Sequence, residues 1–387
     1  MRRADRTVDV LLVGGGVASV RCGRSLRRHG FEGSILLVGA EDRAPYNRPP
    51  LSKELLRHDL PDELLDAEPP AWYARRRIEL RTGVRVTTIN PESRRATLDD
   101  GSTVVFDRCV LATGARLRRL PIPGAERALM LRTASDARRL RATATAIPRG
   151  APAVVVGGGF IGLEVASALA GLGLRPAVVE MAPGLWGGSL GTRLAAWAAR
   201  RLASIGVELR LASSVTRLDD GAAWVGRERL AAAFVVAGIG VVPREELAVG
   251  AGIATADGIV VDSEQRTSHP DIWAAGDVAR TDARRVEHWH AARESGERAA
   301  LSMLDLPVPV PPPAWVFSEI AGEALDVIGS IEGWETDAWV APDRLLAYMR
   351  GGRVVGLASI GGTLAAERAR ALIANGASLS QVGAEIE

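Results

Sequence analysis

The chain has 387 residues, an apolar fraction of 47%, a charged fraction of 24% and a formal net charge of +2. This length predicts two or three domains, and the near-neutral balance gives no reason to expect nucleic acid or a membrane surface as a partner. No later apolar run reaches the roughly 18 residues that a membrane-spanning helix needs, and we expect a cytoplasmic protein.

The N-terminal stretch is typical of a nucleotide-binding βαβ unit. After a basic start that imitates a signal peptide, an apolar strand runs into three consecutive glycines, 14–16, and then into a helix that ends near Gly30. Glycines inside the apolar run argue against a signal peptide. A second strand over 34–41 ends at Glu41. An acidic residue about 20 residues after such a turn is a feature of dinucleotide-binding units.

Lys53 lies in the stretch 44–56, APYNRPPLSKELL, and every other basic residue among the 48 lysines and arginines is an arginine. Arginine and lysine differ in shape and in the geometry of their donors. Near-total replacement of lysine by arginine is typical of a composition bias, and under that bias an isolated lysine is a candidate functional residue. The alternative is a surface lysine on a helix that begins near Ser52.

The same pattern of a strand, a glycine turn and a helix occurs again further along the chain. A strand over 152–156 is followed by Gly157, Gly159 and Gly162, by a helix to about residue 173 and by a strand that ends at Glu180. The glycines allow a tight turn and let backbone N–H groups approach a pyrophosphate at the helix N-terminus. The first copy has Ser19 in the third glycine position, which is small enough to be tolerated. The alternative interpretation of each loop is a simple strand-to-helix turn.

Two other strand-like runs are also followed by small residues and a turn. The first leads into LATGA, which ends at residue 115, and the second leads into AAGDVA, which ends at residue 279. The first nucleotide unit is therefore predicted to be interrupted by the second. A proline run over 307–313 marks the last boundary, and the chain beyond it has alternating strand patterns and a helix. The predicted fold class is α/β, with two Rossmann-like dinucleotide-binding domains and a small α+β C-terminal domain.

Cysteine and histidine usage argues against disulfide or metal chemistry. Cys22 and Cys109 lie far apart and in no CxxC motif, so we interpret them as small buried hydrophobic residues. The five histidines show no metal-ligand spacing, and no metal is predicted. His288 and His290 flank a tryptophan and are interpreted as packing residues.

Together these motifs resemble those of ferredoxin-reductase-type flavoproteins, which feed electrons to cytochromes P450 and ring-hydroxylating dioxygenases. The matching stretches are VGGGVAS, PYNRPPLSK, LATGA, VVVGGGFIGLE, AGIGVVP, RTSHPDIWAAGDVA and RVEHWHAARESGERAA. The resemblance implies a glutathione-reductase-like fold, FAD and NADH as cofactors and a small ferredoxin, [2Fe-2S] or other, as partner. Related disulfide reductases and NADH oxidases carry a reactive cysteine near PYNRPPLSK, and this chain has none there.

The resemblance also implies domain boundaries and site residues. Residues 1–114 and 243–312 would form the FAD-binding domain, 115–242 the NAD-binding domain and 313–387 the C-terminal domain. The residues implied for FAD are Gly14, Gly16, Val17, Ala18, Glu41, Arg48, Lys53, Val86, Ala112, Thr113, Gly114, Gly276, Asp277, Glu287, His288, Trp289 and Phe317. Those implied for the nicotinamide nucleotide are Gly157, Gly159, Phe160, Ile161, Gly162, Glu180 and Gly240.

Some of these residues have specific implied roles around FAD. Glu41 would meet the adenosine ribose, Val86 the adenine, Arg48 the flavin or pyrophosphate and Asp277 the ribityl chain. Lys53 would lie beside the flavin N5 and pair with Glu164, and these two residues are the implied catalytic pair.

Glu180 and Gly240 have implied roles at the nicotinamide nucleotide. A carboxylate at the end of the second strand accepts the ribose 2′-OH and repels a 2′-phosphate, and no arginine follows closely in EMAPGLWGG. NADH is therefore favoured over NADPH. Gly240 would cover the nicotinamide side.

The sequence departs from the family pattern after the proline run. Phe317 stands where the family has a tryptophan near the flavin, and Ile320 stands where glutamine is usual. Two alternatives therefore stay open beside the ferredoxin reductase. One is a stand-alone FAD-dependent oxidoreductase that acts on its own small molecule or on oxygen. The other is a protein similar to apoptosis-inducing factor, whose partner binding is switched by NADH.

Overall fold

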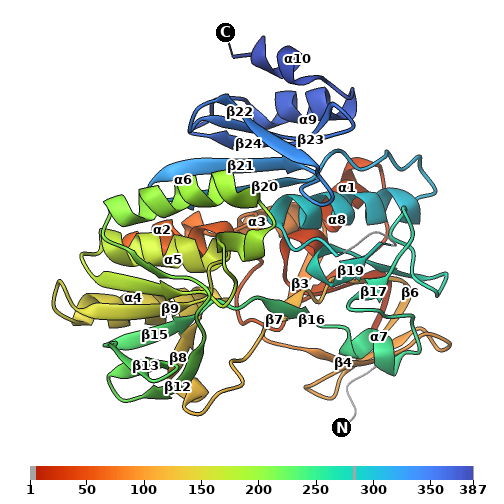
Figure 1. Ribbon diagram of the computed structural model, residues 1–387. Coiled ribbons are helices and arrows are strands. Elements are labelled where there is room, and N and C mark those ends of the chain that lie inside the picture. Colours follow the sequence, from red (N-terminus) through yellow and green to blue (C-terminus); the bar gives the residue numbers. More distant parts are fainter. Residues whose placement is uncertain (1–5, 282–284, 387) are drawn as a thin grey trace. The chain divides into compact units, whose positions relative to one another are not determined.

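The computed structural model describes residues 6–281 and 285–386. The basic start of the chain at 1–5, residues 282–284 and residue 387 lie outside the described residues. The chain forms two compact units, each assembled from three segments (Figure 1). The first unit comprises Met1–Asn47, Pro61–Arg116 and Val241–Pro311, and the second comprises Arg48–Leu60, Leu117–Gly240 and Pro312–Glu387.

The first unit is built on a seven-stranded sheet with the strand order β3-β2-β1-β6-β5-β4, in which β18 also pairs with β6. The strands are β1 (Arg6–Val13), β2 (Ile35–Val38), β3 (Ile78–Arg81), β4 (Val86–Asn90), β5 (Arg95–Leu98), β6 (Thr103–Leu111) and β18 (Ile272–Ala274). β1 runs parallel to β2 and β6, and β18 runs parallel to β6. The apolar runs VLLV at the end of β1 and ILLV in β2 are typical of parallel strands that are buried on both faces.

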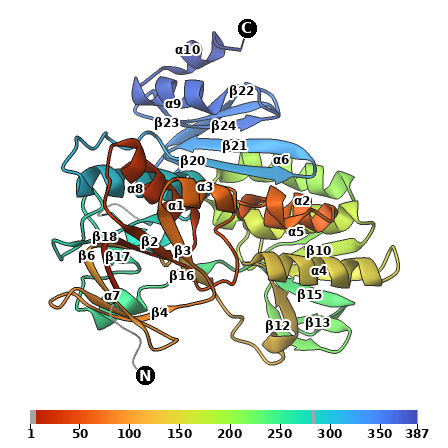
Figure 2. The same ribbon diagram turned by 180° about the vertical axis from the view of Figure 1, so that it is seen from behind.

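Helices cover this sheet and connect its strands. The helices are α1 (Val17–Arg28), η2 (Asp62–Leu64), α3 (Pro70–Arg75), α7 (Glu246–Gly250), η5 (Gly276–Val278) and α8 (Trp289–Met303). The remaining short strands are β7 (Ala115–Leu117), β16 (Val241–Pro243), β17 (Ile259–Val260) and β19 (Ala279–Arg280). α1 and α8 lie side by side (Figure 2). A Cβ atom on Gly296 of α8 would lie 2.2 Å from the carbonyl oxygen of Ala18, so only glycine allows this close approach.

The second unit contains a five-stranded parallel sheet with the order β11-β10-β9-β15-β8 and a three-stranded antiparallel sheet, β12-β13-β14. These strands are β8 (Ala128–Met130), β9 (Pro152–Val156), β10 (Arg175–Val179), β11 (Glu208–Arg210), β12 (Val215–Asp219), β13 (Ala222–Val225), β14 (Glu228–Ala231) and β15 (Phe234–Ala237). The helices are η1 (Pro49–Ser52), α2 (Glu54–Arg57), η3 (Ala125–Arg127), α4 (Ala134–Ala146), α5 (Phe160–Gly171), η4 (Leu185–Gly188) and α6 (Gly191–Ser204).

The same unit ends in an antiparallel sheet with the order β20-β21-β24-β23-β22. Its strands are β20 (Trp315–Ile320), β21 (Glu323–Gly329), β22 (Thr336–Ala341), β23 (Leu345–Arg350) and β24 (Arg353–Ile360), followed by α9 (Ala366–Ala374) and α10 (Leu379–Gly383). α9 and α10 pack on one side of this sheet, while β20 contacts α5 and α6 on the other (Figure 1). The C-terminal sheet therefore reaches the helix that follows the second glycine loop.

The α/β class with two nucleotide-type units is as predicted, and two further segments group with the second unit. Residues 48–60, which carry Lys53, belong to the second unit, where they pack against α4 and α5. The first glycine loop belongs to the other unit. The C-terminal sheet also groups with the second unit. The finer division at residues 114, 242 and 312 stays a prediction.

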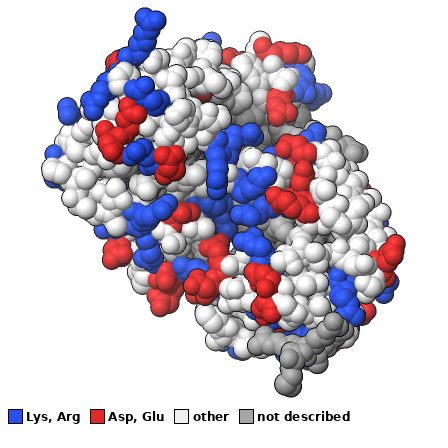
Figure 3. Space-filling view, turned by 90° about the horizontal axis from the view of Figure 1, so that it is seen from below, with Lys and Arg blue, Asp and Glu red and all other residues white. Residues whose placement is uncertain are grey.

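Charged side chains of both signs lie on the face drawn in Figure 3, and basic side chains gather near its centre. Neither sign covers the whole face, which is consistent with the net charge of +2. Within residues 6–281 and 285–386, no helix has both the length and the apolarity that crossing a bilayer requires.

Candidate functional site

The first glycine loop follows β1 and leaves the start of α1 open. Gly14 has a φ of +122°, and a Cβ atom there would lie 2.1 Å from the carbonyl oxygen of Ala112, so glycine is required. Gly16 caps α1 with extended backbone and no side-chain cap, and a Cβ atom there would meet nothing within 4 Å. The first N–H groups of this 12-residue helix can therefore bind a phosphate that approaches over Gly16.

The segments around this loop carry several of the predicted residues. The Tyr46 hydroxyl donates a hydrogen bond to Glu41 Oε2 at 2.7 Å. The Trp289 indole N–H at the start of α8 donates to Asn47 Oδ1 at 3.1 Å, and the His288 side chain caps the same helix. Gly276 donates its N–H to the Ser295 hydroxyl at 2.9 Å. Glu41, the 276–277 turn and the start of α8 thus belong to one unit with the first glycine loop.

Four further residues that are predicted to bind FAD also lie in the first unit: Thr113, Val86, Ala18 and Glu287. The Thr113 hydroxyl donates to the carbonyl oxygen of Arg244 at 2.6 Å, which fixes the loop after β6. Val86 is 5% exposed and lies in the core, so an adenine contact there would involve its main chain. Ala18 is also buried, and Glu287 forms an ion pair with Arg285.

The second glycine loop repeats the arrangement in the second unit with all three glycines. A Cβ atom on Gly157 would lie 2.4 Å from the carbonyl oxygen of Gly238, and one on Gly162 would lie 2.0 Å from that of Gly157. Gly159 caps the 12-residue α5 with extended backbone and open space above it. In the first unit Ser19 occupies the third position; it is fully buried, and its hydroxyl has no hydrogen-bond partner in the described part of the chain.

Glu180 is bound to the backbone of this second loop. Its Oε2 accepts the Gly158 N–H at 2.6 Å, and its Oε1 accepts the Ala182 N–H at 2.7 Å. A carboxylate oxygen has two lone pairs, so each oxygen can still accept a ribose hydroxyl. Ile161, on the first turn of α5, is 46% exposed. Gly240 has a φ of +91° and accepts the Arg118 N–H at 3.0 Å.

Trp186 is a residue of this region that the sequence analysis did not single out. It has a φ of +55°, and its N–H donates to the carbonyl oxygen of Gly158 at 2.9 Å. Its ring centroid lies 5.7 Å from that of Phe160. A tryptophan between Gly184 and Gly187, in the stretch EMAPGLWGG that begins with Glu180, was the available signal.

Lys53 and Glu164 form a buried ion pair within the second unit. Lys53 Nζ lies 2.8 Å from Glu164 Oε1, and the two residues are 9% and 4% exposed. Nζ also donates to the carbonyl oxygen of Pro49 at 3.2 Å, and it lies 5.7 Å from the Phe317 ring centroid. An ammonium has three donors. Two protein oxygens accept from it within the described residues, so one N–H remains for a ligand.

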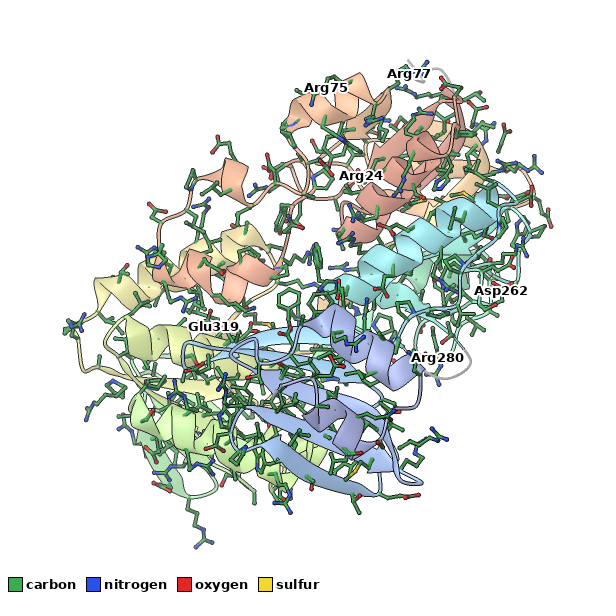
Figure 4. The ribbon with its side chains drawn as sticks, turned by 90° about the horizontal axis from the view of Figure 1, so that it is seen from above. Arg24, Arg75, Arg77, Asp262, Arg280 and Glu319 are labelled. Atoms are coloured by element: carbon green, nitrogen blue, oxygen red, sulfur yellow. The ribbon has the colours of Figure 1, made fainter. Side chains whose placement is uncertain are left out.

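Neighbouring charged residues fix the segment that carries Lys53. Arg57 of α2 binds Glu319 of β20 through two nitrogens, at 2.5 and 3.2 Å, and this hydrogen bonding raises the pKa of Arg57. Glu319 is labelled in Figure 4, on the strand that also carries Phe317. Arg48 donates to the carbonyl oxygen of Arg132 at 3.3 Å.

Two serines that the sequence analysis missed also bind Glu164. The Ser318 hydroxyl donates to Oε1 at 2.7 Å, and the Ser52 hydroxyl donates to Oε2. Each serine directly adjoins a residue that the sequence did single out, Phe317 or Lys53. That adjacency was the available signal, but nothing in the sequence shows that both hydroxyls meet one carboxylate.

The two cysteines are both inaccessible to a substrate that would exchange electrons with a thiol pair. Cys22 on α1 and Cys109 on β6 are both fully buried and unpaired, and burial raises the pKa of both thiols. Within the described residues, no group of three or more histidine, cysteine, aspartate and glutamate side chains is placed to hold a metal ion.

The fold and its two open glycine loops define the class of a two-dinucleotide oxidoreductase. The sequence pattern of the family described as pyridine nucleotide-disulphide oxidoreductase matches residues 8–296, and the chain belongs to that family.

Two relatives and one solved structure are similar to this chain over most of its length. The chain is 35% identical over 338 residues to the biphenyl dioxygenase system ferredoxin--NAD(+) reductase component of Paraburkholderia xenovorans (strain LB400), covering 84% of this chain and 81% of the relative. It is 37% identical over 339 residues, with the same coverage, to the ferredoxin reductase component of the chlorobenzene dioxygenase of Cupriavidus sp. (strain PS12). Among solved structures it resembles a covalent putidaredoxin reductase–putidaredoxin complex, with a TM-score of 0.91, 29% identity and coverage of 98% and 96%. These comparisons confirm the predicted family and fold class.

Proposed function

We propose that this protein is an NADH-dependent FAD reductase that passes electrons singly to a small ferredoxin. The observation that carries the proposal is the presence of two open glycine loops in a chain whose thiols are both buried. Two dinucleotides can exchange a hydride, but no exposed thiol is available to relay it onward as a disulfide would. The names of the relatives, which are ferredoxin reductase components, support the same acceptor.

The residues of the first unit fit FAD. Gly14, Gly16 and the first turn of α1 would hold its pyrophosphate, Glu41 its adenosine ribose and Asp277 its ribityl chain. When bound, FAD supplies a group that accepts a hydride and returns electrons one at a time. The protein supplies orientation and the surrounding charge.

The residues of the second unit fit NADH. The pyrophosphate would meet Gly159 and the first N–H groups of α5, and the ribose 2′-OH would meet Glu180. Because the Glu180 carboxylate is held in place by two backbone donors, it cannot easily turn away from a 2′-phosphate. Charge repulsion therefore favours NADH over NADPH.

Lys53 and Glu164 would act on the flavin side of the reaction. Glu164 holds the ammonium in one position, and the remaining N–H of Lys53 can bind a flavin atom and stabilise negative charge that develops there.

We place this reaction in the cytoplasm, because two unpaired cysteines suit a reducing compartment. The stand-alone oxidoreductase gains no support from the departure at Ile320, since that side chain is fully buried and does not shape an exposed acceptor surface.

The test is steady-state NADH oxidation by the purified protein with a panel of ferredoxins, with oxygen alone and with NADPH in place of NADH. We expect ferredoxin to raise NADH oxidation well above the rate with oxygen, and NADPH to be the poorer donor. Equal rates with and without every ferredoxin would favour the stand-alone oxidoreductase.

A further inference from the structure

The Glu164 carboxylate is held by donors from separate parts of the second unit. Lys53 Nζ and the Ser318 hydroxyl bind Oε1 at 2.8 and 2.7 Å, and the Ser52 hydroxyl binds Oε2. The four residues are between 2% and 9% exposed. Ser52 is the last residue of η1 and directly precedes Lys53, whereas Ser318 comes from β20 of the C-terminal sheet.

This arrangement determines how Lys53 uses its donors. A buried carboxylate must have its lone pairs satisfied, because an unsatisfied buried charge is costly. Two serine hydroxyls satisfy part of that demand, so Lys53 needs only one N–H for Glu164 and uses another for Pro49. Without a serine, the flexible lysine chain can turn a further N–H toward the carboxylate and away from a ligand.

We propose that Ser318 is a positioning residue through which the C-terminal sheet fixes the direction of the Lys53 ammonium. The inference rests on the proposed function, because it takes Lys53 to be the group that meets the flavin. The Phe317 ring, on the same strand, lies 5.7 Å from Nζ and fixes a second side of the ammonium. Strand β20 thus contacts both members of the ion pair, Glu164 through Ser318 and Lys53 through Phe317.

The competing interpretation is that Ser318 is an ordinary buried serine whose hydroxyl happens to find an acceptor. Ser359 of β24 provides a matched control in the same sheet. It is fully buried, its hydroxyl donates to the carbonyl oxygen of Leu364 at 3.0 Å, and it accepts the Leu364 N–H at 2.9 Å. Ser359→Ala should cost folding stability as Ser318→Ala does, but it leaves Glu164 untouched.

The single lysine allows a direct test. In protein labelled with ¹³C only in lysine, one ε-CH₂ signal reports Lys53 in the full chain. Ser318→Ala should displace this signal, and Ser318→Thr, which keeps a hydroxyl, should return it toward the parent position. Ser359→Ala should leave it unchanged. Ser52→Ala removes the other hydroxyl and should also displace it, so the test survives if one Ser318 variant fails to fold.

Two measurements on the flavin-loaded protein complete the test. Ser318→Ala should slow flavin reduction by NADH about tenfold, because small misplacements of catalytic groups have large effects on rate. It should also make the flavin midpoint potential more negative, because the reduced flavin loses part of its positive neighbour, and Ser318→Thr should recover both. If Ser318→Ala matches Ser359→Ala in signal, rate and potential, the inference is wrong. Failure of the parent to reduce any ferredoxin would instead count against the proposed acceptor, since none of these readouts involves one.

Discussion

At Lys53, burial and donor geometry explain why one ammonium persists in a chain that otherwise uses arginine. Its Nζ binds Glu164 at 2.8 Å and Pro49 at 3.2 Å in a site where the residue is 9% exposed. A compact ammonium satisfies two acceptors and keeps a third donor. A planar guanidinium spreads its charge over a wider group and would have to displace the surrounding Ser52 and Phe317.

Lys53→Arg keeps the charge but misplaces it, and Lys53→Met keeps the length but removes it. Both variants should retain FAD, because the glycine loop and the start of α1, not Lys53, are proposed to hold its pyrophosphate. Both should slow flavin reduction by about tenfold or more in stopped-flow mixing with NADH. Reduction of Lys53→Arg at the parent rate would show that the lone lysine has no catalytic role.

Glu180 has two proposed functions, accepting the ribose 2′-OH and repelling a 2′-phosphate, and a pair of substitutions can separate them. Glu180→Ala removes the 2′-OH acceptor and the charge that repels a 2′-phosphate, together with the acceptors of two backbone N–H groups. Glu180→Gln removes the charge but keeps one acceptor oxygen. Both variants should narrow the preference for NADH, with KM for NADH rising about tenfold in the alanine variant. An unchanged ratio of kcat/KM for the two nucleotides would contradict the assignment.

Among the elements, the second glycine loop contains two glycines, Gly159 and Gly162, that are required for different reasons. Gly162 must be glycine because a Cβ atom would lie 2.0 Å from a carbonyl oxygen, whereas Gly159 faces open space with backbone angles that alanine adopts. The first requirement is structural. For Gly159 no packing requirement is present, and we propose that glycine is needed there to let a pyrophosphate approach.

Gly159→Ala and Gly162→Ala should therefore fail in different ways. Gly159→Ala should keep the parent melting temperature, while calorimetric titration should show NAD⁺ binding weakened by about tenfold or more, because the added methyl group would lie where the pyrophosphate is proposed to approach. Gly162→Ala should lower the melting temperature or prevent folding, because the backbone must move to admit the methyl group. Normal NAD⁺ affinity in Gly159→Ala would mean that the nucleotide does not approach over this position.

The same elements show what the sequence could predict and what it could not. Strand, glycine turn and helix are local patterns, so both loops and their acidic residues were predictable from spacing. The position of residues 48–60 in the second unit was not, because it depends on packing against α4 and α5, which lie far along the chain. For the same reason the sequence could name Phe317 and Lys53 but could not show that Ser318 and Ser52 bind one carboxylate.

For the whole molecule, the central question is how electrons leave. The family is named for disulfide chemistry, but the two thiols of this chain are fully buried in α1 and β6. Its relatives are ferredoxin reductase components instead. Electrons that arrive as a hydride must therefore leave without a protein disulfide.

The double variant Cys22→Ala, Cys109→Ala should keep the parent rate of NADH-driven electron transfer. Its stability should fall by about 1–3 kcal/mol, because two small cavities replace buried sulfur atoms. Ferredoxin reduction and thermal unfolding of the same preparation measure the two effects. A large loss of rate at unchanged flavin content would restore a redox role for the thiols.

An anaerobic double-mixing experiment tests whether electrons pass from the reduced flavin to ferredoxin. The protein is first reduced with NADH and then mixed with oxidised ferredoxin, while flavin and ferredoxin absorbance are followed together. We predict that the flavin reoxidises at a rate that rises with ferredoxin concentration and that ferredoxin is reduced in step. A reduced flavin that persists with every ferredoxin tested, but reoxidises as soon as oxygen is admitted, would show that oxygen and not ferredoxin is the acceptor.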